Sequence, residues 1–545
     1  ESVPWGADAV GPADLVLAVG TAAVGTAAVG TAAVGTAAVG TGAVGSGRVA
    51  TDVELAFLRR AGFRDSGRAM RNIVGIAHRS GVGDAAGRGD GEQRRTLARL
   101  MVLALDDLAR SADPDMALNN WERFVAVQPD PRAHLARMLE QPVRLGLLLS
   151  MFATSQFLVD TLVRNPEFLD WIADERRLHG PRSLQAMLGD LRALSSEAVD
   201  HERWLSSIRL FRRRELLRIA ARDFYLGAPI AVTTAELATA ADAVVIVALE
   251  RIGADLYGEL GDGVAILAFG KLGGRELNYS SDIDLATVYD ARRAGLRERA
   301  AALTTRLRQD LSAHTGEQYA YRVDLRLRPY GGSGELVTSS AAFVDYYERH
   351  AGLWETQALL RCRAVAGDIA FGERLLERLQ PAIRRGFGHA EVSATVARMR
   401  DAHTAASTAA SAGRLRRGLD VKNGRGGIRD VEFLVQGLQL SNAREHPHVL
   451  TGHTPTGIER LAESGLLGDD RARVLAEDYA LLRRTEHLLQ VLDDRQVHAI
   501  PADGPALIAL ARRLLGAEAT ERTLVETLAT VTERVHAAYR GWLDA

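Results

Sequence analysis

Cysteine and lysine are nearly absent from this sequence. The single cysteine, Cys362, excludes an internal disulfide and favours a reducing compartment, which predicts a cytoplasmic protein. No cysteines and histidines are spaced as in a zinc site. Only two of the 67 basic side chains are lysines, Lys271 and Lys422. Both lie in glycine-rich segments. Because an ammonium and a guanidinium are not interchangeable at a tight site, both lysines are candidate site residues.

A strong net charge is also lacking, since the formal net charge is −2. Nothing in this balance calls for nucleic acid as a partner, and basic side chains are not interleaved with aromatic ones. Residues 15–47 carry no charge and largely repeat a five-residue Ala-Val-Gly-Thr-Ala unit. This period fits neither helix nor strand. Residues 1–50 are therefore predicted to be a disordered low-complexity extension, with a weak membrane anchor or signal remnant as the alternative.

The remaining chain is long enough for several domains, and helical patterns dominate it. We predict an N-terminal helical domain over 51–230, a catalytic domain over 231–370 and a C-terminal helical bundle over 371–545. One helix is expected over 143–163. Another, over 203–224, has five arginines that we interpret as a solvated face rather than a nucleic-acid surface; they are Arg209, Arg212, Arg213, Arg214 and Arg218. Thr233 or Thr234 is expected to cap the next helix.

The most informative stretch runs from 264 to 289. An apolar run of strand length, 264–269, meets a glycine-rich turn and then a second strand-like run that begins Asp282-Ile283-Asp284. Side chains alternate along a strand, so the two aspartates point the same way. Paired carboxylates suit Mg²⁺, and the preceding glycines allow backbone N–H groups to approach a phosphate. A buried hairpin with a solvated acidic start is the simpler alternative.

A second strand is predicted over 321–329, where apolar and charged residues alternate. Val323, Leu325 and Leu327 would face a core, and Asp324 would face the other side together with Arg322, Arg326 and Arg328. Asp324 would then complete a three-carboxylate site for two cations, beside arginines able to bind phosphate oxygens. The alternative is a surface strand whose aspartate pairs with its arginine neighbours. A glycine-rich loop follows at 331–334, and 354–368 is interpreted as one further segment.

Towards the C-terminus, a glycine-rich charged loop over 420–429 precedes an apolar helix. Glu432, Gln436 and Gln439 share one face of this helix. They either project towards the active cleft or form a satisfied polar seam between helices. Further helices are predicted over 391–409, 470–491, 505–515 and 520–542.

These motifs resemble the glutamine synthetase adenylyltransferase/deadenylylase family, whose catalytic domain is a polymerase-β-type nucleotidyltransferase flanked by helical domains. The resemblance covers most of 55–545 and is most specific at 270–285, 323–337 and 422–439. It implies a mostly α-helical chain with a central α/β domain. Family members carry two homologous halves; one removes AMP from a tyrosine of glutamine synthetase by phosphorolysis, and the other attaches AMP from ATP.

The resemblance implies roles for particular residues. Asp282, Asp284 and Asp324 would be the catalytic residues that hold one or two Mg²⁺ ions. Gly270, Gly273 and Gly274 would cradle the phosphates of ATP, ADP or orthophosphate near Lys271. The other candidates for nucleotide contact are Ser281, Arg326 and Arg328. Glutamine synthetase would be the protein substrate and a PII-type signal protein a regulator, with neither nucleic acid nor a membrane involved.

The direction of the reaction is divided between two patterns. The segments 164–167, 321–324, 427–433 and 486–490, with His498 and Pro501, look like the AMP-removing half, which we favour, whereas 354–359 looks like the attaching half. Three other hypotheses remain: a nucleotidyltransferase with another acceptor, a non-catalytic binding module that kept the fold, and an RNA-acting transferase. Retention of all three aspartates counts against the second, and near-neutral charge against the third.

Overall fold

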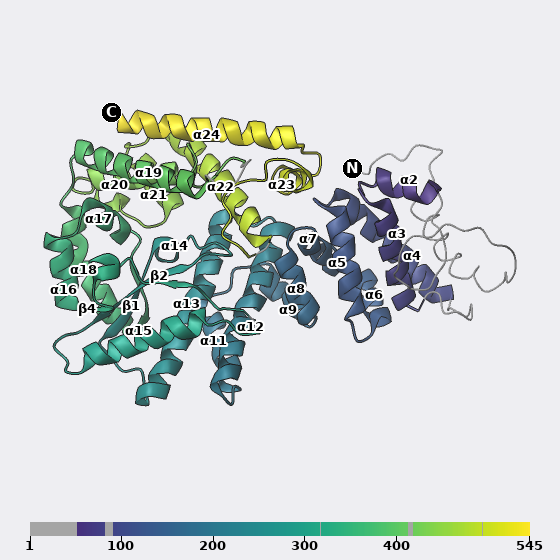
Figure 1. Cartoon of the computed structure of the whole chain (residues 1–545), viewed down its shortest axis with the longest axis horizontal. Helices are drawn as coiled ribbons and strands as arrows, with labels where there is room; N and C mark the ends of the chain where they lie inside the picture. Colours follow the sequence, from purple (N-terminus) through teal and green to yellow (C-terminus); the bar gives the residue numbers. More distant parts are fainter. Residues whose placement is uncertain (1–51, 82–90, 317, 412–417, 493) are drawn as a thin grey trace. The chain divides into compact units, whose positions relative to one another are not determined.

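A computed structural model of the chain describes residues 52–81, 91–316, 318–411, 418–492 and 494–545 (Figure 1). The predicted extension over 1–50 lies outside them. The chain divides into two compact units, Glu1–Asp174 with Leu515–Glu518, and Glu175–Leu514 with Ala519–Ala545. The boundary at Asp174 falls inside the predicted N-terminal domain, and the division into three domains stays a prediction.

The described part of the first unit is helical. Its helices are α2 (Asp52–Arg60), α3 (Ser66–Arg79), α4 (Gly91–Arg110), α5 (Pro114–Ala126), α6 (Pro131–Glu140), α7 (Pro142–Phe152), α8 (Gln156–Arg164) and α9 (Phe168–Ile172). The single helix predicted over 143–163 is wrong, because α7 and α8 are separate. The Ser155 hydroxyl accepts a hydrogen bond from the Leu158 N–H at 3.2 Å and so begins α8 with a side-chain cap.

A small sheet lies at the centre of the second unit. Its strands are β1 (Val264–Phe269), β2 (Ile283–Tyr289), β3 (Val323–Asp324), β4 (Val337–Ser339) and β5 (Arg363–Gly367). The order is β3-β2-β1-β5, and β4 also pairs with β2. β1 runs antiparallel to β2 and β5, whereas β3 and β4 run parallel to β2. The predicted fold class, a mostly α-helical chain with a small central α/β part, is confirmed.

Two sequence-based expectations about the strands are wrong. The strand predicted over 321–329 pairs only at Val323 and Asp324, because the Asp324 side chain accepts the Arg326 N–H at 2.8 Å and turns the chain away. Leu325 is nonetheless buried and Arg326 exposed, as the alternation predicted. In addition, 354–368 was interpreted as one segment, but it holds two elements, most of α17 (Leu353–Leu359) and the strand β5.

Long helices pack around this sheet (Figure 1). α13 (Ile230–Tyr257) contacts β5 and α15 (Leu296–Ser312), α15 contacts β2 and β4, and α18 (Ile369–Arg384) contacts β1 and β5. α13 is the one described helix that is long and apolar enough to cross a membrane, yet 67% of its most apolar window is buried within the protein. Its first turn follows Pro229, so the predicted cap at Thr233 or Thr234 is wrong; both threonines lie inside the helix.

The C-terminal helices form the predicted bundle. They are α19 (His389–Ser411), α20 (Ile428–Asn442), α21 (Thr454–Glu463), α22 (Asp469–Val491), α23 (Pro505–Leu515) and α24 (Glu521–Leu543). α20 contacts α19, α21, α22 and α24, which places it in the middle of the bundle. The second unit also contains the helices α10 (Glu175–Leu178), α11 (Leu184–Ser196), α12 (His201–Ala220) and α16 (Ser340–Arg349).

Four of the five arginines singled out on α12 are buried and Arg214 is half-buried, so the solvated face predicted for them is wrong. Arg209 and Arg218 are fully buried. Arg209 donates to backbone carbonyls, including that of Gln318 at 2.8 Å, and Arg218 lies 2.9 Å from Glu215 and 2.8 Å from Glu236. A buried guanidinium is tolerated because carboxylates and carbonyl oxygens replace its hydration. These arginines therefore hold α12 inside the core.

Candidate active site

The glycine turn at the end of β1 forms a short helix, α14 (Gly270–Gly273), with almost no free space around it. Gly270 has a φ of +58°, and a Cβ there would lie 2.2 Å from a carboxylate oxygen of Asp284. A Cβ at Gly273 would lie 1.8 Å from the Arg361 carbonyl oxygen, and one at Gly274 would lie 2.7 Å from that of Gly452. The turn therefore needs glycine for close backbone packing, and its role as a phosphate cradle stays a prediction.

Replacing Gly273 by alanine is expected to displace this turn, because the backbone atoms that the new methyl meets cannot move aside as a side chain can. We expect activity to fall at least about 10²-fold and stability to fall by about 1–3 kcal/mol. The measurements are turnover and urea-induced unfolding. Gly189→Ala in α11, where no atom lies within 4 Å of the new Cβ, is the control and should retain both properties.

The three aspartates that the sequence singled out lie on or next to two neighbouring strands beside the turn, and their role as metal ligands stays a prediction. Asp282 immediately precedes β2, and Asp284 within β2 is the direct register partner of Asp324 on β3. Burial raises the pKa of Asp284 to about 7, and the nearby negative charges of Asp282 and Asp324 contribute to this rise. The Arg326 guanidinium, by contrast, lowers the pKa of Asp324. Burial and the neighbouring negative charges therefore disfavour the ionised form of Asp284, and a bound cation would stabilise that form.

Two of these carboxylates already have hydrogen-bond partners. Arg326 Nε lies 2.9–3.0 Å from the Asp324 carboxylate, and Gln496 Nε2 lies 3.3 Å from Asp282 Oδ1. Within the described part of the chain, no three His, Cys, Asp or Glu side chains already lie close enough to share one ion. The donor set nevertheless fits Mg²⁺, because it consists of carboxylate oxygens, and the negative charges of Asp282 and Asp324 add to the effect of burial in raising the pKa of Asp284. To bind the ion, the Asp324 carboxylate would give up its hydrogen bonds with Arg326 and coordinate Mg²⁺ instead.

An arginine-rich pocket of about 400 Å³ adjoins Asp282 and Asp324. Its basic lining residues are Arg308, Arg322, Arg326 and Arg328. The Arg328 Nε donates to the Glu335 carbonyl at 2.9 Å, and Arg322 donates to the Ser280 carbonyl at 2.6 Å. Arg308 of α15 is exposed, and its guanidinium has no hydrogen bond or ion pair with any described residue. The sequence indicated Arg326 and Arg328 but missed Arg308, which comes from a separate helix.

The only two lysines meet at one buried carboxylate, Glu486 of α22. The Lys271 ammonium lies 3.0 Å from Glu486 Oε1, the Lys422 ammonium 3.7 Å, and His498 Nδ1 3.2 Å. Burial lowers the pKa of Lys271 to about 7, although Glu486 opposes this shift. The sequence singled out both lysines, yet the partner that they share lies more than 60 residues away along the chain.

The other sequence-predicted residues have structural contacts. The buried Ser281 hydroxyl accepts a hydrogen bond from the Asn278 N–H at 3.3 Å, which fixes the loop before β2. On α20, Glu432 pairs with Arg361 at 3.1 Å, and Gln439 donates to the Val449 carbonyl at 2.8 Å. Gln436 accepts from Gln357, so this face contacts neighbouring segments as in the predicted polar seam, although Gln439 Oε1 is buried without a hydrogen-bond partner. Burial raises the pKa of the Cys362 thiol, which disfavours a nucleophilic role.

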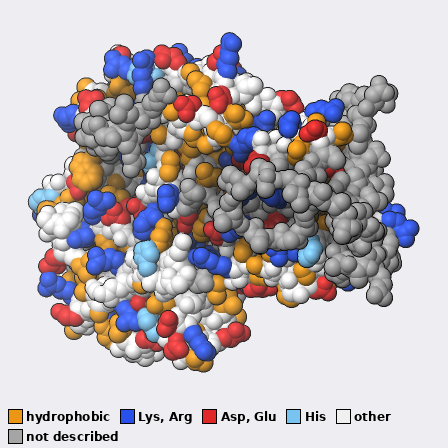
Figure 2. Space-filling view, turned by 45° about the vertical axis from the view of Figure 1, so that its right-hand side comes forward, with side chains coloured by type: hydrophobic (Ala, Val, Ile, Leu, Met, Phe, Trp, Pro, Cys, Tyr) orange, Lys and Arg blue, Asp and Glu red, His pale blue; other side chains and the backbone are white. Residues whose placement is uncertain are grey.

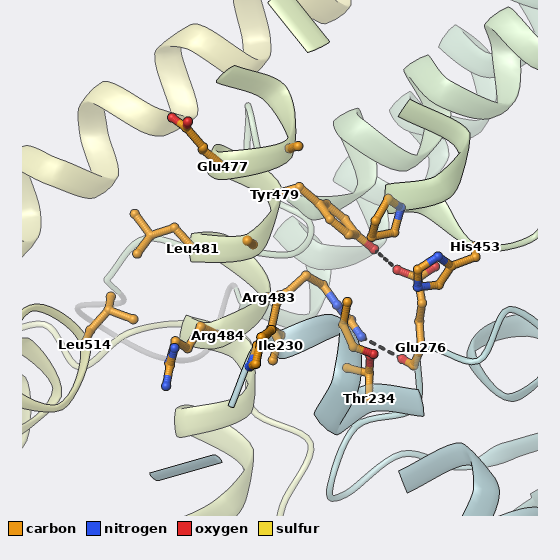
Figure 3. Close-up of a pocket in the computed structure, with 15 residues that line it drawn as sticks. Ile230, Thr234, Glu276, His453, Glu477, Tyr479, Leu481, Arg483, Arg484 and Leu514 are labelled. Atoms are coloured by element: carbon orange, nitrogen blue, oxygen red, sulfur yellow. Dashed lines mark hydrogen bonds between the residues drawn. The ribbon is translucent and has the colours of Figure 1, made fainter. Parts of the chain in front are cut away.

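A second pocket, of about 550 Å³, lies between the first turn of α13, the 453–455 segment and α22 (Figure 3). On its wall, the Tyr479 hydroxyl donates to the Glu276 carboxylate at 2.6 Å, and Arg483 donates to the Glu276 carbonyl at 2.6 Å. Its lining is largely apolar.

On the face seen in Figure 2, acidic and basic side chains are interspersed rather than gathered into one broad basic patch.

Comparison with known proteins identifies two family-model matches, which together cover residues 145–543. Residues 145–378 match the family model for glutamate-ammonia ligase adenylyltransferase, and residues 373–543 match that for PII-uridylyltransferase. The chain is 35% identical over 408 residues to the bifunctional glutamine synthetase adenylyltransferase/adenylyl-removing enzyme of Xanthobacter autotrophicus. The aligned region covers 71% of this chain and 40% of that protein.

Two Streptomyces relatives with the same description are similar over more of the chain. The S. avermitilis protein is 36% identical over 460 residues, which is 81% of this chain and 44% of the relative. The S. coelicolor protein is 34% identical over 469 residues, or 84% of this chain and 44% of the relative. The chain thus spans less than half the length of these curated relatives.

Proposed function

The chain belongs to the glutamine synthetase adenylyltransferase family, and from this premise we propose that it is a Mg²⁺-dependent nucleotidyltransferase that removes AMP from adenylylated glutamine synthetase. The reaction would be phosphorolysis, in which orthophosphate attacks the adenylyl group and ADP is formed. The observation that carries this proposal is the convergence of Asp282, Asp284 and Asp324 beside a pocket rich in arginine.

The residues of the site would act by position and charge. Asp282, Asp284 and Asp324 would hold Mg²⁺, which when bound neutralises phosphate oxygens and draws the reacting groups together. The arginine pocket would bind orthophosphate and direct one of its oxygens at the phosphorus of AMP. A new P–O bond forms, the bond from phosphorus to the tyrosine oxygen breaks, and the tyrosine leaves to recover its proton. No covalent intermediate with the protein is needed.

The pocket supports phosphorolysis over attachment of AMP. Four arginines line it, and guanidinium groups match the oxygens of an entering phosphate. The sequence segments that resemble the AMP-removing half point the same way. Attachment of AMP from ATP is the second candidate, favoured by the 354–359 segment, in which Trp354 is exposed.

One assay tests the proposal and its alternatives. The purified chain with Mg²⁺ is given adenylylated glutamine synthetase and orthophosphate, or unmodified glutamine synthetase and ATP, and nucleotide products are separated. Release of ADP in the first reaction supports the proposal. Release of pyrophosphate only in the second would reverse the direction, and no product in either reaction would point to another acceptor.

Two further parts of the proposal concern the setting of the reaction. The match of residues 373–543 to the PII-uridylyltransferase model supports a PII-type signal protein as a regulatory partner. A cytoplasmic location is supported by the presence of a single cysteine and by the burial of the long apolar helix α13.

Arg308 is expected to contribute to phosphate binding, since it lines the pocket with its guanidinium unengaged. Arg308→Met should raise the KM for orthophosphate about 10-fold and leave the KM for adenylylated glutamine synthetase unchanged, because one charge-assisted contact is lost. Initial rates at varied phosphate give the result. Arg349→Met, which removes an exposed arginine paired with Asp345 on α16, is the control. An unchanged KM for phosphate would place the anion elsewhere.

A further inference from the structure

The surroundings of Glu486 carry more positive charge than the carboxylate can neutralise. Lys271, Lys422 and Arg483 all place a cationic nitrogen within 3.7 Å of Glu486, at 3.0, 3.7 and 2.7 Å. Glu486 itself is fully buried. The charge of Glu432 also acts on Lys271 and Arg483, and Glu432 is itself paired with Arg361. The cations around these two carboxylates still outnumber them, and an anion that enters from the open side would complement the remaining positive charge.

Lys422 is the member of this cluster whose donors are available. The Arg483 side chain is 2% exposed and the Lys271 side chain 16%, whereas Lys422 is 20% exposed. Lys271 also donates two hydrogen bonds to Glu486, at 3.0 and 3.2 Å. The Lys422 ammonium, at 3.7 Å, is too distant for a hydrogen bond to Glu486 and makes none with the described residues. It is held by charge alone.

The same cluster adjoins the three carboxylates. Gln496 contacts Asp282, and two residues later the His498 carbonyl accepts the Val421 N–H at 2.9 Å, beside Lys422. From the other side, Lys271 directly follows Gly270, whose backbone lies against Asp284. The charge of Lys422 also acts on Asp284. The loop before α20 thus brings an unengaged ammonium to the edge of the predicted Mg²⁺ site.

We propose that Lys422 binds a phosphate group of the substrate, and that Glu486 is the positioning residue that holds Lys422 there. The inference rests on the proposed function for the identity of the anion, which is either a nucleotide phosphate or free orthophosphate. The inference gives the loop before α20 a direct contact with the substrate, in addition to the residues from the sheet, its turn and α15.

The lysine content of the chain permits a direct test by labelling. The probe is an ADP acyl phosphate, whose acyl carbon is attacked by a lysine amine; an amide bond forms, the acyl–phosphate C–O bond breaks, ADP leaves and the amine proton passes to solvent. Because the chain has two lysines, peptide mass spectrometry separates labelling of Lys422 from that of Lys271. We expect Lys422 to be labelled; Lys271 can react as well, because its pKa of about 7 leaves part of its amine without a proton.

Competition identifies the anion that Lys422 binds. Protection by Mg²⁺–ADP but not by orthophosphate would assign a nucleotide phosphate, and protection by orthophosphate alone would assign the attacking phosphate. Failure to label Lys422, or labelling of Lys422 that neither anion slows, would overturn the inference. The experiment contains no glutamine synthetase, so it can succeed even where the proposed deadenylylation fails.

A binding measurement complements the labelling. Lys422→Met should weaken Mg²⁺–ADP or orthophosphate binding about 10- to 100-fold, as loss of a charge-assisted contact implies, and Lys422→Arg should restore part of it. Arg425→Met removes a positive charge from the same loop, but from a side chain that faces Glu533, and should bind like wild type. Equal binding by Lys422→Met and wild type would also overturn the inference.

Discussion

Replacement of Asp284 by asparagine is expected to lower turnover at least about 10³-fold while the protein stays folded. Asp284 lies in register with Asp324 and one residue from β2's first position, so it is the central member of the carboxylate group. Asparagine keeps the shape of the side chain but removes the negative charge that would hold Mg²⁺. The measurement is ADP release from adenylylated glutamine synthetase, with circular dichroism as the check on folding.

The same variant has a second expected property, which separates a metal-binding role from a structural one. Because the pKa of Asp284 is raised from 3.8 to about 7, the folded protein binds more protons than the unfolded chain between these pH values. Metal-free stability should therefore fall as pH rises from about 4 to about 7. The asparagine variant lacks this loss and should unfold at a higher temperature than wild type at pH 8 in EDTA.

A control makes the result specific. Asp345→Asn removes an exposed carboxylate on α16 that pairs with Arg349, and it should leave both turnover and melting temperature near wild type. If Asp284→Asn were instead less stable than wild type without metal, the carboxylate would have a structural role. If it turned over normally, the three-carboxylate site would not be the active site.

The parts of the site that the sequence predicted are those encoded by neighbouring residues. The run 264–269 is β1 and 505–515 is α23, because apolar period and length identify each element locally. The convergence of Asp282 and Asp284 likewise follows from strand alternation. Asp324 was predicted to lie beside them because it belongs to a second stretch in which apolar and charged residues alternate. Only two residues of that stretch, Val323 and Asp324, pair with β2.

The parts that the sequence did not predict depend on contacts between distant segments. Arginines at helical spacing are typical of a solvated face, yet Arg218 and Arg222 are buried because Glu236 on the next helix lies within 2.8 Å of each. In the same way, nothing near Lys271 or Lys422 indicates Glu486. An ion pair of this kind is a property of the folded chain, and periodicity in one segment cannot reveal it.

Replacement of Glu486 by glutamine is expected to cost about 3–5 kcal/mol of unfolding free energy, because it leaves buried cations without their counter-charge. Lys271 has a pKa lowered to about 7, and Glu486 is what keeps that pKa from falling further. In the variant, Lys271 would lose its proton at lower pH. The deficit should therefore be largest below pH 7 and shrink as pH rises through about 7, since a neutral amine needs no counter-charge.

Urea-induced unfolding at several pH values measures this effect, and two further variants interpret it. Glu533→Gln removes an exposed carboxylate paired with Arg425 and should change stability by less than about 0.5 kcal/mol. Lys271→Met combined with Glu486→Gln should recover part of the loss, because one of the cations left without its counter-charge is then absent. A Glu486→Gln protein as stable as wild type at every pH would show that the carboxylate does not hold the two lysines, and Lys422 would then need another residue to position it.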